Sequence, residues 1–284
     1  GPGGSGPGES RQGDGSPAPR PRSVTRRPPA IPSTVDGLAV DDYPPIEPGL
    51  PPVLVVHGAM DRAGGFRRLV RHLPRCRVVT FDRRGYSRSI GEPCATLDDA
   101  VRDLAAVRAV LGESPVLVFG HSQGGLIVLR AAADGVLGDA DALAVYEPPM
   151  PWHDWYLAEL GDRLLLRPPD EVAERFLRGV LGDAVWERLP PSIRAARRGD
   201  GAALLADLRA SRARGAEPRW DDIHLPVTAL RGECSVPHNR RTVDELVARL
   251  GAVAAVEVPA ADHGAHISQP AALARCLLDA QPPS

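Results

Sequence analysis

Six short apolar runs recur along the chain after residue 50, and the segments between them mix polar and apolar residues with a helical period. Apolar runs of this length, rich in Val, predict buried strands. The runs are 52–58, 77–82, 115–120, 142–147, 226–232 and 254–259. Strands that alternate with helices predict an α/β fold with a mostly parallel central sheet and helices on both faces.

Two of the intervening segments carry the clearest helix signals. Between the second and third runs, Thr96 and Asp99 have the spacing of a capping box, and Gly112 suits the residue that ends the last turn. Farther along, residues 170–180 place apolar side chains on one side of a helix. We therefore predict helices within 96–112 and 170–180.

The chain divides into three parts by pattern. Residues 1–34 are rich in Gly, Pro, Ser and Arg and lack apolar periodicity, which predicts a disordered N-terminal tail. Residues 148–222 contain helical patterns but no strand pattern, which predicts a helical cap inserted into the sheet domain. Residues 35–147 and 223–284 then form the core domain.

Charge and composition exclude several classes of function. The net charge of the 284 residues is −2 and the arginines form no stripe, so we expect no nucleic-acid partner. All 34 residues counted as Lys plus Arg are arginines, which excludes a Schiff-base lysine and a P-loop lysine. No apolar run approaches the roughly 20 residues that span a bilayer. We expect a cytoplasmic protein without a membrane partner.

A single serine stands between two glycines where a predicted strand meets a predicted helix, in the sequence GHSQG (120–124). A sharp turn at this point lifts the hydroxyl of Ser122 above the sheet and aims the N–H of Gln123 at the same place. Gly120 and Gly124 leave room for the turn, because side chains there would collide with the neighbouring strand and helix. The pattern predicts a nucleophilic serine.

Four segments in this order resemble the α/β-hydrolase fold superfamily. VLVVHGAM resembles its oxyanion strand end, FDRRGYSRS its next strand and turn, GHSQG its nucleophile elbow, and PAADHGAHISQP its terminal histidine loop. The resemblance covers roughly residues 37–278 and implies the α/β-hydrolase fold with a helical cap. It implies Ser122 as the nucleophile, His263 as the base, and the N–H groups of Ala59 and Gln123 as the oxyanion hole.

The acid of the triad departs from the family pattern. The usual aspartate stands three residues after the glycine that ends the strand before the last, and this chain has Ser235 there. Some members of the fold carry the acid after the preceding strand, where this chain has Glu147. We expect Glu147 to orient His263, and Glu233 is the alternative.

The other histidines are expected to be structural. His57 and His121 lie beside glycines of two site loops, where the family uses such residues to shape the loop. His266 follows His263 by three residues, but no acid or cysteine is spaced to complete a metal site with this pair. No zinc or disulfide spacing joins the four cysteines, Cys76, Cys94, Cys234 and Cys276. We expect neither a metal nor an organic cofactor.

These features predict a serine hydrolase that cleaves an ester, thioester or lactone through a covalent acyl-enzyme. The substrate is expected to be a small molecule with an apolar acyl or ring group, because the insertion and its edges hold all four tryptophans. Met60, Trp152 and Trp155 are the candidate substrate-binding residues. Two alternatives stay open: a lyase, cyclase or acyl transferase on the same fold, and a lidded ligand-binding protein with a weak triad. The oligomeric state is left open.

Overall fold

The structure of this chain is a computed structural model. It describes residues 26–282 apart from residues 90, 92, 95, 113–114, 140, 157–163 and 251–254.

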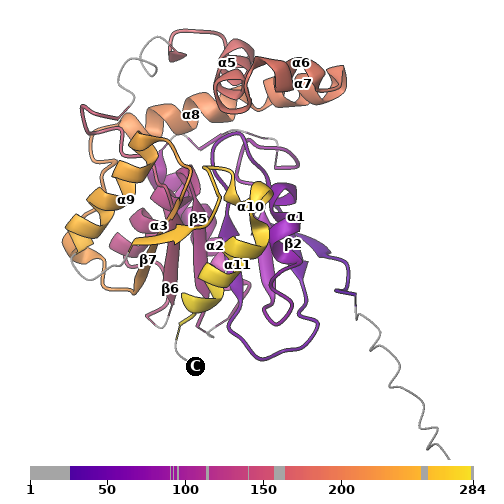
Figure 1. Cartoon of the computed structure of the whole chain (residues 1–284), viewed down its shortest axis with the longest axis vertical. Helices are drawn as coiled ribbons and strands as arrows, with labels where there is room; N and C mark the ends of the chain where they lie inside the picture. Colours follow the sequence, from indigo (N-terminus) through magenta and orange to yellow (C-terminus); the bar gives the residue numbers. More distant parts are fainter. Residues whose placement is uncertain are drawn as a thin grey trace, which may run out of the picture.

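The described residues contain one eight-stranded sheet with the strand order β1-β2-β4-β3-β5-β6-β7-β8 (Figure 1). Strand β2 pairs antiparallel with β1 on one side and with β4 on the other. The remaining pairs, from β4 with β3 to β7 with β8, are parallel. The strands are β1 (Ile31–Val35), β2 (Leu38–Tyr43), β3 (Val53–Val56), β4 (Val78–Phe81), β5 (Leu117–His121), β6 (Ala142–Tyr146), β7 (Val227–Gly232) and β8 (Ala255–Val258).

The six predicted strands are confirmed as β3 to β8. The sequence missed β1 and β2. The predicted tail boundary at residue 34 is wrong, because residues 31–34 belong to β1; residues 1–25 lie outside the described part of the chain. Backbone pairing with β2 holds β1 at the sheet edge, and its side chains are mostly exposed. Such a strand carries no apolar alternation, so the sequence pattern gave no signal for it.

Each face of the sheet has its own apolar core because successive strand residues point to opposite faces. Leu54 and Val56 pack on the side of α2 (Leu97–Ala109), α3 (Gln123–Ala133) and α9 (Pro237–Leu250). Val53 and Val55 pack on the side of α1 (Arg67–Val70), α10 (Ala265–Ser268) and α11 (Pro270–Asp279). Helices on both faces are therefore confirmed.

The predicted capping box at the start of α2 is also confirmed. The Thr96 side chain accepts a hydrogen bond from the backbone N–H of Asp99, and the Asp99 side chain accepts one from the backbone N–H of Thr96. Helix α2 ends three residues before Gly112, whose φ of +71° lies in the left-handed region that glycine favours.

Between β6 and β7, the described residues form helices and no strand. These are α5 (Pro169–Leu181), α6 (Asp183–Arg188), α7 (Pro191–Gly199), α8 (Gly201–Arg212) and the 3₁₀ turn η2 (Trp220–Asp222). Figure 1 shows α5 to α8 gathered at one end of the sheet. The predicted helix within 170–180 is α5. In the described part of the chain, no helix combines the length and apolarity needed to cross a bilayer.

A buried ion pair fastens α8 to the sheet. The Arg83 guanidinium, in the loop after β4, donates to both carboxylate oxygens of Asp207 at 2.9 and 2.7 Å. The hydroxyl of Tyr86 also donates to Asp207, at 2.6 Å. The resemblance assigned this DRRGYSRS segment a structural turn, and the contacts of Arg83 and Tyr86 are of that kind.

We expect Asp207→Ala to lower the free energy of unfolding by about 3–5 kcal/mol, because it leaves the buried Arg83 charge without its partner. Urea denaturation measures this loss. The control is Glu171→Ala, which removes an exposed ion pair with Arg167 and should cost at most about 1 kcal/mol. Equal losses in the two variants would contradict the role given to Asp207.

Candidate active site

Ser122 lies at a strained turn between β5 and α3. Its φ of +52° places a residue with a side chain in the left-handed region, which costs roughly 1–3 kcal/mol. A Cβ on Gly120 would lie 2.6 Å from the carbonyl oxygen of Gly124, and a Cβ on Gly124 would lie 2.1 Å from that of Val56. Only glycine fits at both positions, so the elbow packs directly against the end of β3.

Glu147, which directly follows β6, contacts His263 in the loop after β8. Nδ1 of His263 lies 2.6 Å from Oε2 of Glu147, and the backbone N–H of Gly232 donates to Oε1 at 2.8 Å. The Glu147 side chain is fully buried, whereas the His263 side chain is 33% exposed. Because a carboxylate only accepts, Nδ1 of His263 carries the proton and Nε2 keeps a free lone pair.

The other acids near this loop bind elsewhere. Glu233 is exposed, and its Oε2 accepts from the backbone N–H of Ala260 at 2.8 Å. Asp262 accepts from the N–H of Gly264 at 2.8 Å. Of the two predicted acids, the structure therefore brings Glu147, and not Glu233, to His263.

Three loops meet around Ser122. Nε2 of His121, the residue before Ser122, lies 2.7 Å from the carbonyl oxygen of His263. The Tyr146 hydroxyl donates to the carbonyl oxygen of Asp262 at 2.5 Å. A Cβ on Gly58 would lie 3.0 Å from Cβ of Ser122. The loop after β3, the serine turn and the histidine loop thus converge at the carboxyl ends of the parallel strands, where α/β sheets gather their chemistry.

The two predicted oxyanion donors come from two of these loops. Gln123 is the first residue of α3, so its N–H belongs to the helix N-terminus and has no partner within the helix. Ala59 lies in the loop after β3. The next residue, Met60, has a φ of +59°, and its carbonyl oxygen accepts from Nη1 of Arg197 in α7 at 3.0 Å. A side chain of the helical insertion therefore contacts the loop that carries Ala59.

The predicted substrate-binding residues lie in two apolar clusters. Met60 is 4% exposed and packs in the core of the helical insertion with the fully buried Trp186. Trp152 and Trp155 are partly buried against the sheet core. The Trp155 ring stacks on His153 at 5.0 Å and lies 4.4 Å below the guanidinium carbon of Arg241. Their contact with a substrate stays a prediction.

His57 shapes the loop after β3. Its Nε2 accepts from the backbone N–H of Arg83 at 2.9 Å, so Nδ1 carries the proton and donates to the carbonyl oxygen of Gly58 at 2.7 Å. Burial, and then the positive charge of Arg83, lowers the pKa of His57 to about 4. Burial, followed by the neighbouring His266 and His263, also lowers the pKa of His121. Both imidazoles are therefore neutral near pH 7.

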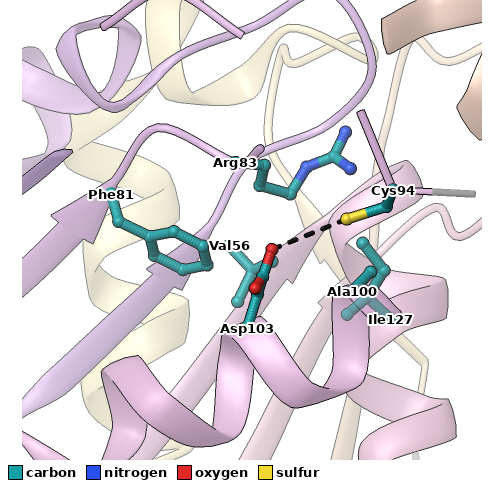
Figure 2. Close-up of a pocket in the computed structure, with 7 residues that line it drawn as sticks. All are labelled: Val56, Phe81, Arg83, Cys94, Ala100, Asp103 and Ile127. Atoms are coloured by element: carbon teal, nitrogen blue, oxygen red, sulfur yellow. Dashed lines mark hydrogen bonds between the residues drawn. The ribbon is translucent and has the colours of Figure 1, made fainter. Parts of the chain in front are cut away.

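Figure 2 shows a small cavity beside α2, which contributes Ala100 and Asp103 to its lining. Its volume is about 10 Å³, room for no more than one water. Val56, Arg83 and Asp103 are among its lining residues, and Sγ of Cys94 donates to Asp103 across it at 3.5 Å. None of the predicted site residues lines this cavity, so it is separate from the predicted site.

The sequence missed Asn239 as a site residue. Asn239 lies near the start of α9, is 7% exposed, and its side-chain amide lies 3.2 Å from Nδ1 of His263. The available signal was its position, since it follows the carboxyl end of β7 at the same sheet edge as the other site residues. No motif distinguishes it from the polar residues beside it.

Comparison with protein-family models gives a match over residues 53–276, to a model described as the alpha/beta hydrolase family. Among curated proteins, this chain is similar to lipase LipV of Mycobacterium tuberculosis, with 30% identity over 156 residues. That alignment covers 55% of this chain and 58% of the lipase, so it spans little more than half of either protein.

Alignments with solved structures of similar fold cover nearly the whole of those proteins' chains. A hydrolase of this fold from Sphaerobacter thermophilus is 25% identical with a TM-score of 0.63, over 88% of this chain and 98% of that one. The enol-lactonase from Burkholderia xenovorans is 18% identical with a TM-score of 0.65, over 88% and 98% of the two chains. At 18% identity, this second likeness supports the fold alone.

We expect Gly124→Ala to destabilise the protein by about 3 kcal/mol, because the added methyl group would overlap the carbonyl oxygen of Val56. The matched control is Gly179→Ala in α5, where nothing lies within 4 Å of the new Cβ. That substitution should stabilise the helix by about 0.5–1 kcal/mol. Thermal and urea unfolding of both variants measure these changes. If Gly124→Ala is as stable as Gly179→Ala, the elbow is not tightly packed.

Proposed function

This chain belongs to the alpha/beta hydrolase family, and from that premise we propose that it is a serine hydrolase acting on an ester, thioester or lactone. Ser122 is the nucleophile, His263 the general base and acid, and Glu147 the group that orients the imidazole. The observation that carries the proposal is the hydrogen bond between the buried Glu147 carboxylate and Nδ1 of His263.

The hydrogen bond to Glu147 gives His263 the tautomer that a general base needs. With its proton on Nδ1, the imidazole presents the lone pair of Nε2, which takes the proton of the Ser122 hydroxyl as its oxygen attacks the substrate carbonyl. The Glu147 charge stabilises the imidazolium that forms. His263 then gives that proton to the leaving alcohol or thiol, and an acyl-enzyme on Ser122 remains.

Water completes the cycle by the same route. His263 takes a proton from the attacking water, the acyl–oxygen bond to Ser122 breaks, and the proton returns to the serine oxygen. In both halves the developing oxyanion accepts from the N–H groups of Ala59 and Gln123. The positive end of α3 adds to this stabilisation because its first turn points at the same place.

One relative and the helical insertion support this substrate class. A similar curated protein is a lipase, which favours cleavage of an acyl–oxygen bond. Met60, Trp152 and Trp155 then supply apolar surface for an acyl or ring group. The helices between β6 and β7 act as the cap.

No step of this mechanism requires a metal or an organic cofactor, and we place the protein in the cytoplasm.

We expect a fluorophosphonate probe to label the wild-type protein, because such probes react with activated serines. Ser122→Ala should abolish the labelling without lowering the melting temperature, and mass spectrometry of the peptide that contains residue 122 should locate the adduct. Absence of labelling in the folded wild-type protein would favour a lidded binding protein instead.

We expect Glu147→Gln to lower the turnover of short nitrophenyl esters by about 10³–10⁴, since loss of the triad acid leaves the imidazole without its orienting charge. Glu233→Gln is the matched control and should keep the wild-type rate, because Glu233 binds the backbone of Ala260. The opposite ranking of the two variants would overturn the assignment of the acid. Labelling of Ser122 without ester turnover would indicate a non-hydrolytic use of the same site.

A further inference from the structure

Beside the proposed catalytic residues, the fold gathers a second set of ionisable side chains, Asp61, His121 and His266. Asp61 lies in the loop after β3, His121 ends β5, and His266 lies in α10. One potential ligand atom from each residue lies within 4.8 Å of those of the other two. From sequence we expect no third ligand for the pair of His263 and His266; the fold instead brings Asp61 and His121 to His266.

His121 has one ring nitrogen without a hydrogen-bond partner in the described part of the chain. Its Nε2 lies 2.7 Å from the carbonyl oxygen of His263, so Nε2 carries the proton and Nδ1 does not. Nδ1 is buried and has no hydrogen-bond partner among the described residues. A buried acceptor without a hydrogen-bond partner is unfavourable, so this nitrogen is a candidate ligand atom.

The backbone of residue 58 packs close to Nδ1 of His121, and a side chain at this position would crowd that nitrogen. A Cβ on Gly58 would lie 3.0 Å from this nitrogen. The same Cβ would lie 3.0 Å from Cβ of Ser122, so Gly58 lies beside both the cluster and the proposed nucleophile.

Asp61 and His266 form the other side of the cluster. Nε2 of His266 lies 2.9 Å from Oδ2 of Asp61, whereas Oδ1 of Asp61 accepts from the backbone N–H of Arg62 at 2.8 Å. The His266 ring is 3% exposed and stacks on Phe66 with centroids 4.3 Å apart, so its orientation is fixed. The Asp61 side chain is 16% exposed, whereas His121 and His266 are 5% and 3% exposed.

We propose that Asp61, His121 and His266 form a binding site for a divalent transition-metal ion of the Zn²⁺ type. Two imidazole nitrogens and one carboxylate oxygen are a donor set that Zn²⁺ and Co²⁺ prefer, and three protein ligands leave a fourth position open. Metal–ligand bonds near 2.0–2.2 Å in a tetrahedron set the ligand atoms roughly 3.4 Å apart. Side-chain shifts of about 1 Å would bring the three donor atoms to that spacing.

Binding replaces the contact between His266 and Asp61 with two metal–ligand bonds. Nε2 of His266 binds the metal through its lone pair, so the neutral imidazole carries its one proton on Nδ1. The ion then joins the loop after β3, the serine turn and the histidine loop without touching the reacting atoms. It acts as a structural clamp on these three loops.

The test is calorimetric titration of the folded protein, free of any histidine tag, with Zn²⁺. We expect one ion per chain, and Asp61→Asn and His266→Gln should each weaken binding by about 100-fold or more because each removes a ligand. Two controls should keep the wild-type affinity. Glu147→Gln breaks the other buried histidine–carboxylate pair, and His72→Gln removes an exposed surface histidine.

A second measurement needs no variant. The ¹⁵N resonance of Nδ1 of His121 should shift on addition of Zn²⁺ to the wild-type protein, and Co²⁺ should give the intense visible absorption of a tetrahedral site. Absence of saturable binding, or an unmoved His121 resonance at saturating Zn²⁺, would overturn the proposal. So would binding that survives Asp61→Asn and is lost in Glu147→Gln, since that result would place the ion on His263.

Discussion

The carboxylate of Glu147 is a full charge held inside the protein, and such a charge is tolerated only where donors surround it. Two donors reach it, the N–H of Gly232 at the end of β7 and Nδ1 of His263 after β8. The charge therefore joins three neighbouring strand ends of the sheet. It also fixes which nitrogen of His263 faces outward with a lone pair. The proposed chemistry depends on this one buried interaction.

The strands bring these groups together at a local cost in backbone strain. Met60, Ser122 and Glu147 follow β3, β5 and β6, and all three have positive φ values. Each costs roughly 1–3 kcal/mol, so the packed sheet has to hold them in place. Two apolar cores, one on each face, supply that rigidity. The contacts between Arg83 and Asp207 and between Arg197 and Met60 then tie the helical insertion to the same edge.

The central sheet was predictable because its strands are buried on both faces and form continuous apolar runs. The edge strand β1 could not be predicted, because its residues are mostly exposed and show no alternation of apolar and polar side chains. Ser122 and His263 lie in local motifs that the sequence displays. Glu147 could be preferred to Glu233 from its place at a strand end, but only tertiary structure brings it to His263. Asn239 and Asp61 reach the site through contacts between segments far apart in sequence, which no local pattern encodes.

Nuclear magnetic resonance of the His263 imidazole tests the central interaction most directly. We expect a low-field proton resonance on Nδ1 that correlates with the nitrogen of His263, persists in Glu233→Gln and disappears in Glu147→Gln. A neutral imidazole that carries its proton on Nε2 in the wild-type protein would contradict it, because Nδ1 would then have no proton to donate to Glu147.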